Sequence, residues 1–275
     1  MAHKLMSHRR RNVILSEAKN PGERCGKVGD PSTQPSKFLG PKPKNLDGLA
    51  QDDHIKNMVN FKTIIILGRP GAGKGTQAAL LAEKTGFRHL STGDILRKRA
   101  KRQDNLGAKI KKLIDEGKFV SDEIILNVIF EAIKKAFQEG KKGVILDGLP
   151  RNLSQAESLS SFLKAENFEN PLAINVNISN QEAIFRLTNR KTCSRCGKTI
   201  PYSEKTADLK KCPECKGKLI TRPDDREEVV RERLKIYEEE TALVIDFYKE
   251  KGLLKEVEGE RPIEEIHRDI LSLVS

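Results

Sequence analysis

Residues 63–76 read TIIILGRPGAGKGT, and helical spacing resumes directly after them in Gln77-Ala-Ala-Leu-Leu-Ala-Glu83. The short run of β-branched residues predicts a buried parallel strand. Glycines at 71, 73 and 75 allow backbone N–H groups to wrap a phosphate, because no Cβ intervenes. The N-terminus of the following helix adds partial positive charge, and Lys74 adds a full one. The segment therefore predicts a site for the phosphates of a nucleoside triphosphate.

The loop departs from the common phosphate-loop pattern at one position. That pattern places Ser or Thr directly after the lysine to bind Mg²⁺. Here Gly75 follows Lys74, and Thr76 comes one residue later. The alternative interpretation is a glycine-rich turn without a ligand. The order of strand, loop and helix favours phosphate binding over that alternative.

Length and composition indicate a soluble protein of one large domain or two small ones. The chain has 275 residues, of which 37% are hydrophobic, and no apolar run approaches the roughly 20 residues that cross a bilayer. Lys and Arg number 51 against 39 Asp and Glu, which gives a net charge of +12. Residues 1–57 hold 11 basic and 6 acidic residues, so they carry +5 and the remainder carries +7. This excess suits polyphosphate substrates and, more weakly, nucleic acid.

Residues 1–57 have no sustained periodicity and contain five prolines, so they cannot bury enough apolar area to order themselves. Three interpretations compete: a disordered tail, a targeting peptide, or a misassigned start with Met58 as the true first residue. His8-Arg9-Arg10-Arg11 suggests targeting, but no apolar segment follows it and acidic residues are interspersed. The misassigned start or an inert extension is favoured, with the folded core at 58–275.

Strand and helix patterns alternate from residue 61 onward, which predicts a parallel sheet with helices on both faces. The predicted strands are 63–67, 87–90, 142–146, 172–178 and 252–257. Helices are predicted over 77–83, 91–97, 107–116, 121–137, 179–190 and 224–250, and after Pro262. Ser179-Asn-Gln-Glu182 has the spacing of a capping box.

Three polar clusters follow predicted strands, and ligands of open α/β sheets lie beyond the carboxyl ends of the strands. They are the loop at 68–76, the segment Ser91-Thr-Gly-Asp94 with Arg97, and Asp147 to Arg151. Asp147 is expected to organise Mg²⁺ through its waters; the alternative is a helix-capping aspartate. Arg97 and Arg151 each resemble ordinary surface arginines in isolation. Because both point at one cleft, they are expected to clamp a second phosphate group.

A second group of arginines lies downstream. Arg186 and Arg190 are spaced i, i+4 and share a helix face, Arg222 follows the cysteine-containing insert, and Arg233 lies within the predicted helix 224–250. Asp, Glu and Arg at helical spacing also commonly form a solvated, salt-bridged face. The residues alone leave these two interpretations open.

Four of the five cysteines form two CxxC pairs separated by fifteen residues, Cys193/Cys196 and Cys212/Cys215. Four thiolates close a tetrahedron around Zn²⁺ and leave no open position, so the predicted metal is structural. It would order an insert too small for its own core. A metal site fits better than a disulfide framework and implies a reducing, cytoplasmic location. Cys25 is given no role.

Four motifs occur in order at family spacing: residues 68–76, Ser91-Thr-Gly-Asp94 with Arg97, Asp147-Gly-Leu-Pro-Arg151 with Gln155, and Arg222-Pro-Asp-Asp225. Together they resemble the adenylate kinase family, specifically its long-lid, zinc-containing bacterial form, over about residues 62–274. The resemblance implies an α/β P-loop nucleoside monophosphate kinase fold. An AMP-binding flap within 91–122 and a zinc-binding lid at 191–222 would be inserted into the core.

The resemblance implies reversible transfer of a phosphoryl group from MgATP to AMP, which gives two ADP and maintains the adenine nucleotide balance. The implied ATP-binding residues are Gly71, Ala72, Gly73, Lys74, Gly75, Thr76, Arg186, Arg190 and Arg261. The implied AMP-binding residues are Thr92, Arg97, Val120, Gly148, Arg151, Gln155, Arg222 and Arg233. Lys74, Asp147, Arg190, Arg222 and Arg233 would be catalytic. The resemblance thus shifts the interpretation of the downstream arginines toward function.

The chain departs from the family at two positions: Leu149 stands where Phe is usual, and Leu243 where Pro is usual. A kinase for UMP, CMP or GMP is the nearest alternative, although such relatives usually have a short lid. A nucleic-acid-binding module is a second alternative. The chain has no Trp and only three Tyr, so it lacks an aromatic platform for stacking bases. A monomer that binds ATP and AMP, without nucleic acid or membrane partners, is therefore expected.

Overall fold

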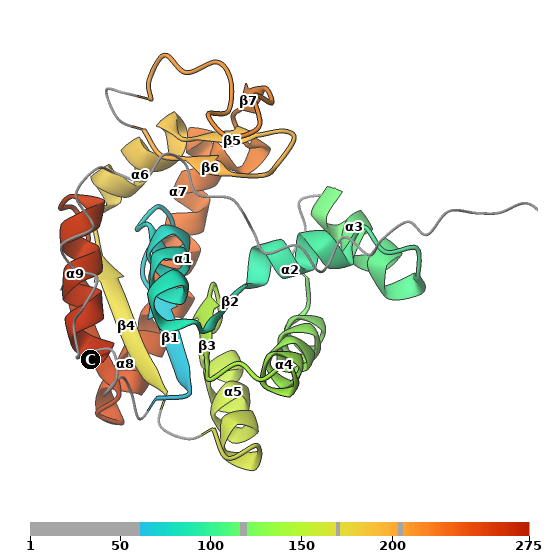
Figure 1. Cartoon of the computed structure of the whole chain (residues 1–275), viewed down its shortest axis with the longest axis vertical. Coiled ribbons are helices and arrows are strands. Elements are labelled where there is room, and N and C mark those ends of the chain that lie inside the picture. The colour runs from blue at the N-terminus through green and yellow to red at the C-terminus, as the bar shows by residue number, and fades with distance from the viewer. Residues whose placement is uncertain (1–60, 116–119, 169–170, 203–205, 275) are drawn as a thin grey trace, which may run out of the picture. The chain divides into compact units, whose positions relative to one another are not determined.

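The computed structural model describes residues 61–115, 120–168, 171–202 and 206–274. A five-stranded parallel sheet forms the centre of this part of the chain (Figure 1), with strand order β2-β3-β1-β4-β8. The strands are β1 Thr63–Leu67, β2 Arg88–Ser91, β3 Val144–Asp147, β4 Leu172–Asn177 and β8 Leu254–Glu258. This confirms the predicted fold class. The expectations for residues 1–57 lie outside the described residues.

Helices connect the strands. They are α1 Lys74–Thr85, α2 Thr92–Arg99, α3 Asn105–Asp115, α4 Asp122–Gln138, α5 Leu153–Ala165, α6 Asn180–Asn189, α7 Glu227–Ile236, α8 Ala242–Glu250 and α9 Ile263–Val274. A 3₁₀ turn, η4 Pro223–Asp225, precedes α7, and a π turn, η5 Tyr237–Thr241, separates α7 from α8.

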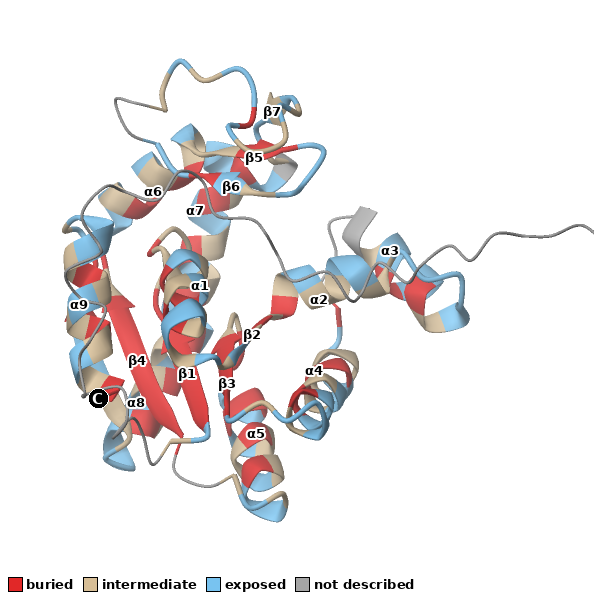
Figure 2. Cartoon of the chain, viewed as in Figure 1, coloured by how far each residue is buried: buried red, intermediate tan, exposed pale blue. Residues whose placement is uncertain are grey.

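Both faces of the sheet are covered, as the alternation of strands and helices predicts. Ile64 and Ile66 of β1 belong to a buried cluster with residues of α1, α6, α7 and α9. Ile65 and Leu67 belong to a second cluster, with residues of α4, α5 and α8. Every residue of β1 is therefore buried, and Figure 2 shows the same for most of β4. A strand covered on both faces needs the continuous apolar run seen in the sequence.

Three local features differ from the sequence-based expectation. Helix α5 was not predicted, because its serines favour caps and turns over helix interiors. Burial of Ala156, Leu159 and Leu163 against the sheet outweighs that weak preference. The predicted helix 224–250 is interrupted by η5, and the cysteine-containing insert holds a small sheet.

The capping box at Ser179 is only half formed. The Ser179 side chain accepts a hydrogen bond from the Glu182 amide at 3.2 Å, as the spacing predicts. The reciprocal partner is different: the Ser179 amide donates to Glu260 at 2.6 Å, while Glu182 accepts from Arg186 at 2.6 Å. The cap therefore joins α6 to the loop before α9.

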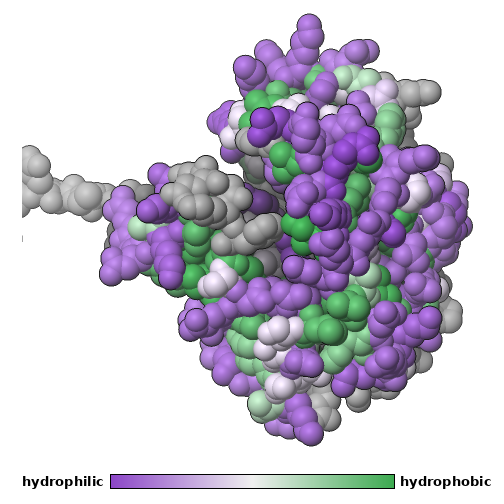
Figure 3. All heavy atoms as spheres, turned by 180° about the vertical axis from the view of Figure 1, so that it is seen from behind, coloured by the Kyte–Doolittle hydropathy of each residue, from purple (hydrophilic) through white to green (hydrophobic). Residues whose placement is uncertain are grey.

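In the described part of the chain, every helix lacks the combination of length and apolarity that a bilayer crossing requires. The face seen in Figure 3 is mainly hydrophilic, with hydrophobic residues in separate patches.

Candidate functional site

The phosphate loop connects β1 to α1 at the carboxyl edge of the sheet. Gly71 and Gly73 have φ values of 88° and 82°, a conformation that L side chains rarely adopt. Gly75 is helical, and a Cβ there would lie 3.2 Å from Asp147 Oδ2. Gly68, which sequence reasoning did not single out, has φ 137° and a Cβ there would lie 2.4 Å from the Val176 carbonyl oxygen. Backbone conformation alone requires glycine at 73, limited space favours it at 75, and both conditions apply at 68 and at 71, where a Cβ would lie 3.1 Å from the Ala183 carbonyl oxygen.

Some backbone N–H groups of the phosphate loop already donate hydrogen bonds within the loop and the start of α1. The Ala72 amide donates to the Arg69 carbonyl at 3.1 Å. The amide of Gln77 makes the first helical bond, to Gly73 at 3.0 Å. The amides of residues 74–76 precede that bond in the first turn of α1, where helix N–H groups have no intrahelical partner. These amides are suited to an anion.

Lys74 folds back over the loop. Its Nζ donates to the carbonyls of Gly68 at 2.8 Å and Arg69 at 2.7 Å. Burial is the main reason that the pKa of Lys74 falls from 10.5 to about 8, and Asp147 opposes the fall. Repulsion from Arg151, Arg233 and Arg190 adds to it. The ammonium therefore lies among like charges that an anionic ligand would neutralise.

Asp147 ends β3 and pairs in register with Ile66 of β1, one strand from the phosphate loop. Its Oδ2 lies 3.8 Å from His89 Nε2. Burial alone would raise the pKa of this carboxyl, but His89, Lys74 and Arg151 outweigh burial and hold the pKa below its ordinary value. The capping interpretation of Asp147 is wrong, because the N-cap of the next helix, α5, is Asn152.

Thr92, Gly148 and Arg151 lie together on the other side of Asp147. A Cβ on Gly148 would lie 3.3 Å from Arg151 Nη2 and 3.9 Å from Thr92 Oγ1. Thr92 is only 3% exposed, and its Oγ1 has no hydrogen-bond partner among the described residues. A buried hydroxyl without a partner is costly unless a ligand satisfies it. This is the strongest sign of a second ligand subsite.

The other residues predicted for this subsite differ in their contacts and in their burial. Arg97 pairs with Asp94 at 2.5 Å on α2. Val120 is buried, whereas residues 116–119 of the predicted flap lie outside the described residues. Leu149, where the family usually has Phe, is 1% exposed and packs in the α4/α5/α8 cluster.

Arg151 is held by three neighbours. Its Nε donates to the Gly148 carbonyl at 2.9 Å, and its amide donates to Gln155 Oε1 at 2.8 Å. Its carbonyl accepts from Thr241 Oγ1 of the π turn at 2.8 Å. Gln155 in turn donates to Asp122 at 2.6 Å. Sequence reasoning missed Thr241, which lies near no recognisable motif, and treated Asp122 only as part of a helix start.

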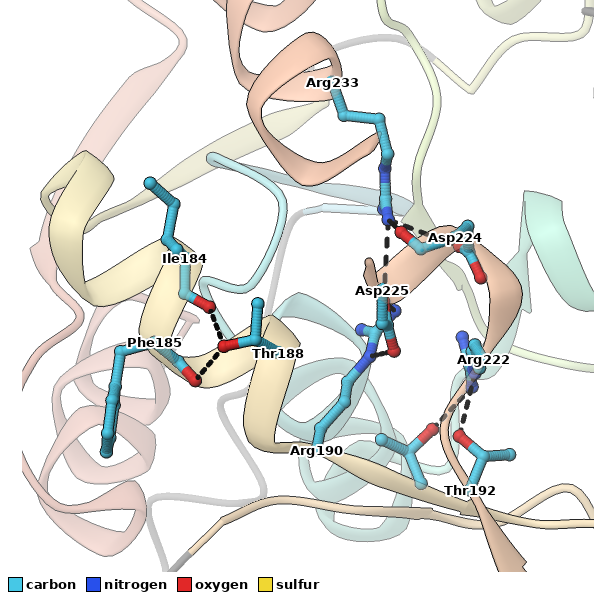
Figure 4. A network of polar contacts seen from close by, with 10 residues as sticks. Ile184, Phe185, Thr188, Arg190, Thr192, Arg222, Asp224, Asp225 and Arg233 are labelled. Atoms are coloured by element: carbon cyan, nitrogen blue, oxygen red, sulfur yellow. Dashed lines mark hydrogen bonds and ion pairs between the residues drawn. The ribbon is translucent and has the colours of Figure 1, made fainter. Parts of the chain in front are cut away.

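Arg190, Arg222 and Arg233 lie close to two aspartates (Figure 4). Arg190 makes a bidentate pair with Asp225, at 2.5 and 2.6 Å. Arg233 donates to the Asp224 carbonyl at 3.0 Å and lies 3.7 Å from Asp225. Arg222 donates to the hydroxyls of Thr192 at 2.8 Å and Thr199 at 2.7 Å.

These arginines also repel one another electrostatically. Burial is the main cause of the lowered pKa of Arg222, and Arg190 and Arg97 add repulsion. Burial likewise lowers the pKa of Arg233, attraction to Asp224 and Asp225 opposes the fall, and repulsion from Arg190 and Arg151 adds to it. The structure thus brings together six cations, which we call the cation cluster: Lys74, Arg97, Arg151, Arg190, Arg222 and Arg233.

Two further residues that the family resemblance implies for ATP binding form ion pairs with other partners. Arg186 pairs with Glu182 within α6, and Arg261 pairs with Glu258 and Asp269 beyond β8. The salt-bridged-face interpretation does hold for Arg231, an exposed residue that pairs with Glu227 one turn away. Arg231 thus pairs within α7, whereas Arg233 of the same helix pairs with Asp224, which precedes the helix.

The cysteine-containing insert includes a small antiparallel sheet of β5 Lys191–Cys193, β6 Thr199–Ile200 and β7 Leu219–Ile220. The sulfurs of Cys193, Cys196, Cys212 and Cys215 all lie within 4.8 Å of one another. Two of the pairs are 3.3 and 3.7 Å apart, close to the ~3.8 Å edge of a tetrahedron with Zn–S bonds of about 2.3 Å. The backbone N–H of Cys196 above all, with that of Arg195, lowers the pKa of the Cys193 thiol to about 6. The donor set is therefore compatible with structural zinc.

Close approach explains Gly217 in this insert. A Cβ there would lie 2.7 Å from the Arg195 Cβ and 2.8 Å from the Cys193 sulfur. A side chain at 217 would therefore push the two cysteine turns apart.

A phosphate loop after the central strand, a carboxylate one strand away and a cation cluster define a P-loop phosphotransferase that handles nucleotides. Comparison with known proteins narrows this class. The chain belongs to the adenylate kinase family, whose model, described as adenylate kinase, matches residues 66–253. The four-cysteine cluster is consistent with the long-lid zinc type.

Individual relatives agree with the family model. An adenylate kinase of Archaeoglobus fulgidus is 41% identical over 213 residues, which are 77% of this chain and 97% of that protein. One from Thermotoga neapolitana is 41% identical over 215 residues, 77% of this chain and 96% of that protein. One from Thermodesulfovibrio yellowstonii is 41% identical over 213 residues, 77% of this chain and 98% of that protein.

Proposed function

We propose that this enzyme catalyses the reversible transfer of a phosphoryl group from MgATP to AMP, which gives two ADP and maintains adenine nucleotide balance. The cation cluster carries the proposal, because its members come from both sides of Asp147 and from the lid. Family membership supports AMP as the acceptor and does not favour UMP, CMP or GMP.

On the ATP side, the loop residues Gly71, Ala72, Gly73, Gly75 and Thr76 would surround the phosphates with Lys74. Arg186, Arg190 and Arg261 would complete this side. On the AMP side, the unpartnered hydroxyl of Thr92 supports a ligand contact. Its partners there would be Arg97, Val120, Gly148, Arg151, Gln155, Arg222 and Arg233.

Phosphoryl transfer requires alignment and charge stabilisation, with little covalent work by the protein. Lys74, Arg190, Arg222 and Arg233 would stabilise the charge on the group in transit. Mg²⁺ bound with ATP would supply further neutralisation, and Asp147 is the residue that would organise it through its waters. The aspartates 224 and 225 already orient two of these arginines, which reduces the entropy lost when substrate arrives.

Water competes with AMP as an acceptor, so the site must exclude it before transfer. We assign the lid to 191–222 and the flap to 91–122, within a core of 58–275. The four cysteines would hold one structural Zn²⁺ that lets the lid move as a unit. Free thiols of this kind suit a reducing cytoplasm. The protein would act as a monomer without nucleic acid or membrane partners.

The test is a coupled assay for ADP with MgATP and each of AMP, UMP, CMP and GMP. AMP is expected to give the highest kcat/KM, and a diadenosine pentaphosphate should bind tightly because it spans both subsites. Higher kcat/KM with another monophosphate, or weak binding of the pentaphosphate, contradicts the proposal.

A further inference from the structure

The segment that ends α2 and forms α3 carries most of the net charge of the chain after residue 57. Residues 98–115 contain seven Lys and Arg and two Asp, which gives a net charge of +5. Residues 58–275 carry +7 in all, so the positions of that range outside the segment together carry only +2. The positive charge is therefore concentrated in one short stretch and not spread over the protein.

Five exposed cations of this segment have no carboxylate within salt-bridge distance among the described residues. We call them the flap patch: Lys98, Lys101, Arg102, Lys109 and Lys111. Asp104, which lies between them in sequence, is already engaged. Its two oxygens accept from Arg99 at 2.7 and 2.8 Å, and one of them also accepts from the Gly107 amide at 2.7 Å. Asp104 thus compensates Arg99 and leaves the charge of the patch in place.

The flap patch adjoins the predicted monophosphate subsite. The helix α2 begins at Thr92, whose buried hydroxyl has no hydrogen-bond partner among the described residues. Lys98 lies six residues further along the same helix, a rise of about 9 Å. The start of α3 packs closely on the turn after α2, because a Cβ on Gly107 would lie 2.3 Å from the Arg102 carbonyl oxygen. The patch is therefore near the subsite, and its exposed side chains would act on a ligand through their field.

A field of this kind affects how fast an anion arrives. A phosphate monoester carries a charge of about −1.5 to −2 near pH 7. Surface charge of the opposite sign raises the rate of association of such a ligand by roughly 10- to 1000-fold. The Debye length is about 30 Å at 0.01 M salt and about 8 Å at 0.15 M. A patch about 9 Å from the subsite is thus strongly felt at low salt and screened at high salt.

We propose that the flap patch steers the nucleoside monophosphate dianion toward its subsite and so raises the rate of substrate capture. The inference rests on the proposed function, in which that subsite binds AMP, and it adds residues that need not touch the substrate. A small anion suits the patch better than a nucleic acid does. Residues 91–115 contain no aromatic side chain on which bases could stack.

The test variant replaces the four lysines of the flap patch with glutamine: Lys98→Gln, Lys101→Gln, Lys109→Gln and Lys111→Gln. The kcat/KM for AMP is measured at saturating MgATP over a series of NaCl concentrations. At low salt it is expected to fall roughly three- to tenfold while kcat stays unchanged, because steering acts on association. The difference from the wild type should vanish at high salt. An unchanged kcat/KM at low salt, or a fall that persists at high salt, overturns the inference.

The matched control removes four exposed lysines near the amino ends of the strands, on the opposite edge of the sheet: Lys84→Gln, Lys142→Gln, Lys164→Gln and Lys249→Gln. It changes the net charge equally, so an equal fall in kcat/KM would show an effect of total charge and overturn the inference. Glutamate at the four flap positions should lower the low-salt kcat/KM below that of the glutamine variant. Equal values for these two variants would indicate lost packing and would also overturn it.

The remaining outcomes separate the two proposals. A wild-type enzyme without AMP-dependent turnover would refute the proposed function itself. A wild-type enzyme that uses AMP with a kcat/KM independent of salt would refute only the steering role. An RNA oligonucleotide that binds the wild type at 0.15 M salt but not the glutamine variant, with equal AMP kinetics in both, would assign the patch to nucleic acid and overturn the inference.

Discussion

Arg190 and Asp225 form a bidentate ion pair between the two ends of the cysteine-containing insert, with N–O distances of 2.5 and 2.6 Å. Asp225 is 1% exposed and also lies 3.7 Å from Arg233. One buried carboxylate therefore orients two arginines of the cation cluster. Asp224 shares the compensation of the Arg233 charge with it.

Replacing Asp225 with Ala should destabilise the protein strongly, because it leaves the partly buried Arg190 guanidinium without its bidentate partner. The free energy of unfolding is expected to fall by about 3 kcal/mol. Asp224→Ala is the control: its side chain is 51% exposed, so the loss should stay below about 1 kcal/mol. Urea unfolding followed by circular dichroism measures both, and equal losses would contradict the role given to Asp225.

Lys74→Met should remove phosphoryl transfer while the fold remains intact. The loss of one positive charge at the transferring group is expected to lower kcat by roughly a thousandfold or more. The control is Lys84→Met, an exposed lysine in the last turn of the same helix, which should keep wild-type activity. The coupled ADP assay gives the rates. Activity of Lys74→Met near the wild-type value would refute the assignment of Lys74.

Proton uptake should accompany ATP binding near pH 8.5. The pKa of Lys74 is about 8 in the folded apoprotein and 10.5 ordinarily, so the unfolded chain binds the extra proton between these values. The contribution of this residue therefore makes the apoprotein more stable as pH rises through that window. Bound phosphates would raise the pKa again and draw a proton. Calorimetry in buffers of different ionisation enthalpy should detect the proton uptake. Uptake that persists in Lys74→Met would show that another group binds the proton.

Cys196→Ser should release the metal from the lid and lower thermal stability. A shift in Tm of roughly 5 °C or more is expected, since 1 kcal/mol corresponds to about 2–4 °C in a protein of this size. Ser194→Ala, in the same turn but not a ligand, is the control. Metal content by atomic emission and Tm by calorimetry provide the readouts. Retained zinc with an unchanged Tm would exclude the four-cysteine site.

Sequence reasoning identified the features that depend on local order. The phosphate loop, the CxxC pairs and the apolar strand β1 are contiguous or nearly so, and their chemistry is readable from spacing. The carboxyl ends of parallel strands lie at one edge of the sheet, so the strand pattern alone also predicts that Asp147 lies near the phosphate loop.

The missed features depend on contacts between distant segments. Asp122 and Gln155 are 33 residues apart, and Thr241 and Arg151 are 90 apart, so no local pattern marks them. Gly68 needs its missing Cβ because of the Val176 carbonyl on the neighbouring strand β4. The π turn is likewise a tertiary effect: it places Tyr237 and Thr241 on the buried side of the chain. Helical periodicity alone predicts an uninterrupted helix there.

The 3.2 Å approach between a Cβ at position 75 and Asp147 Oδ2 explains why the loop lacks a hydroxyl directly after its lysine. A serine or threonine there would crowd the aspartate that ends β3. Under the proposed function, Asp147 at the end of β3 would organise Mg²⁺ through its waters, and the residue directly after the lysine would supply no oxygen ligand. The start of α1 and the end of β3 therefore limit the size of the residue that each can carry.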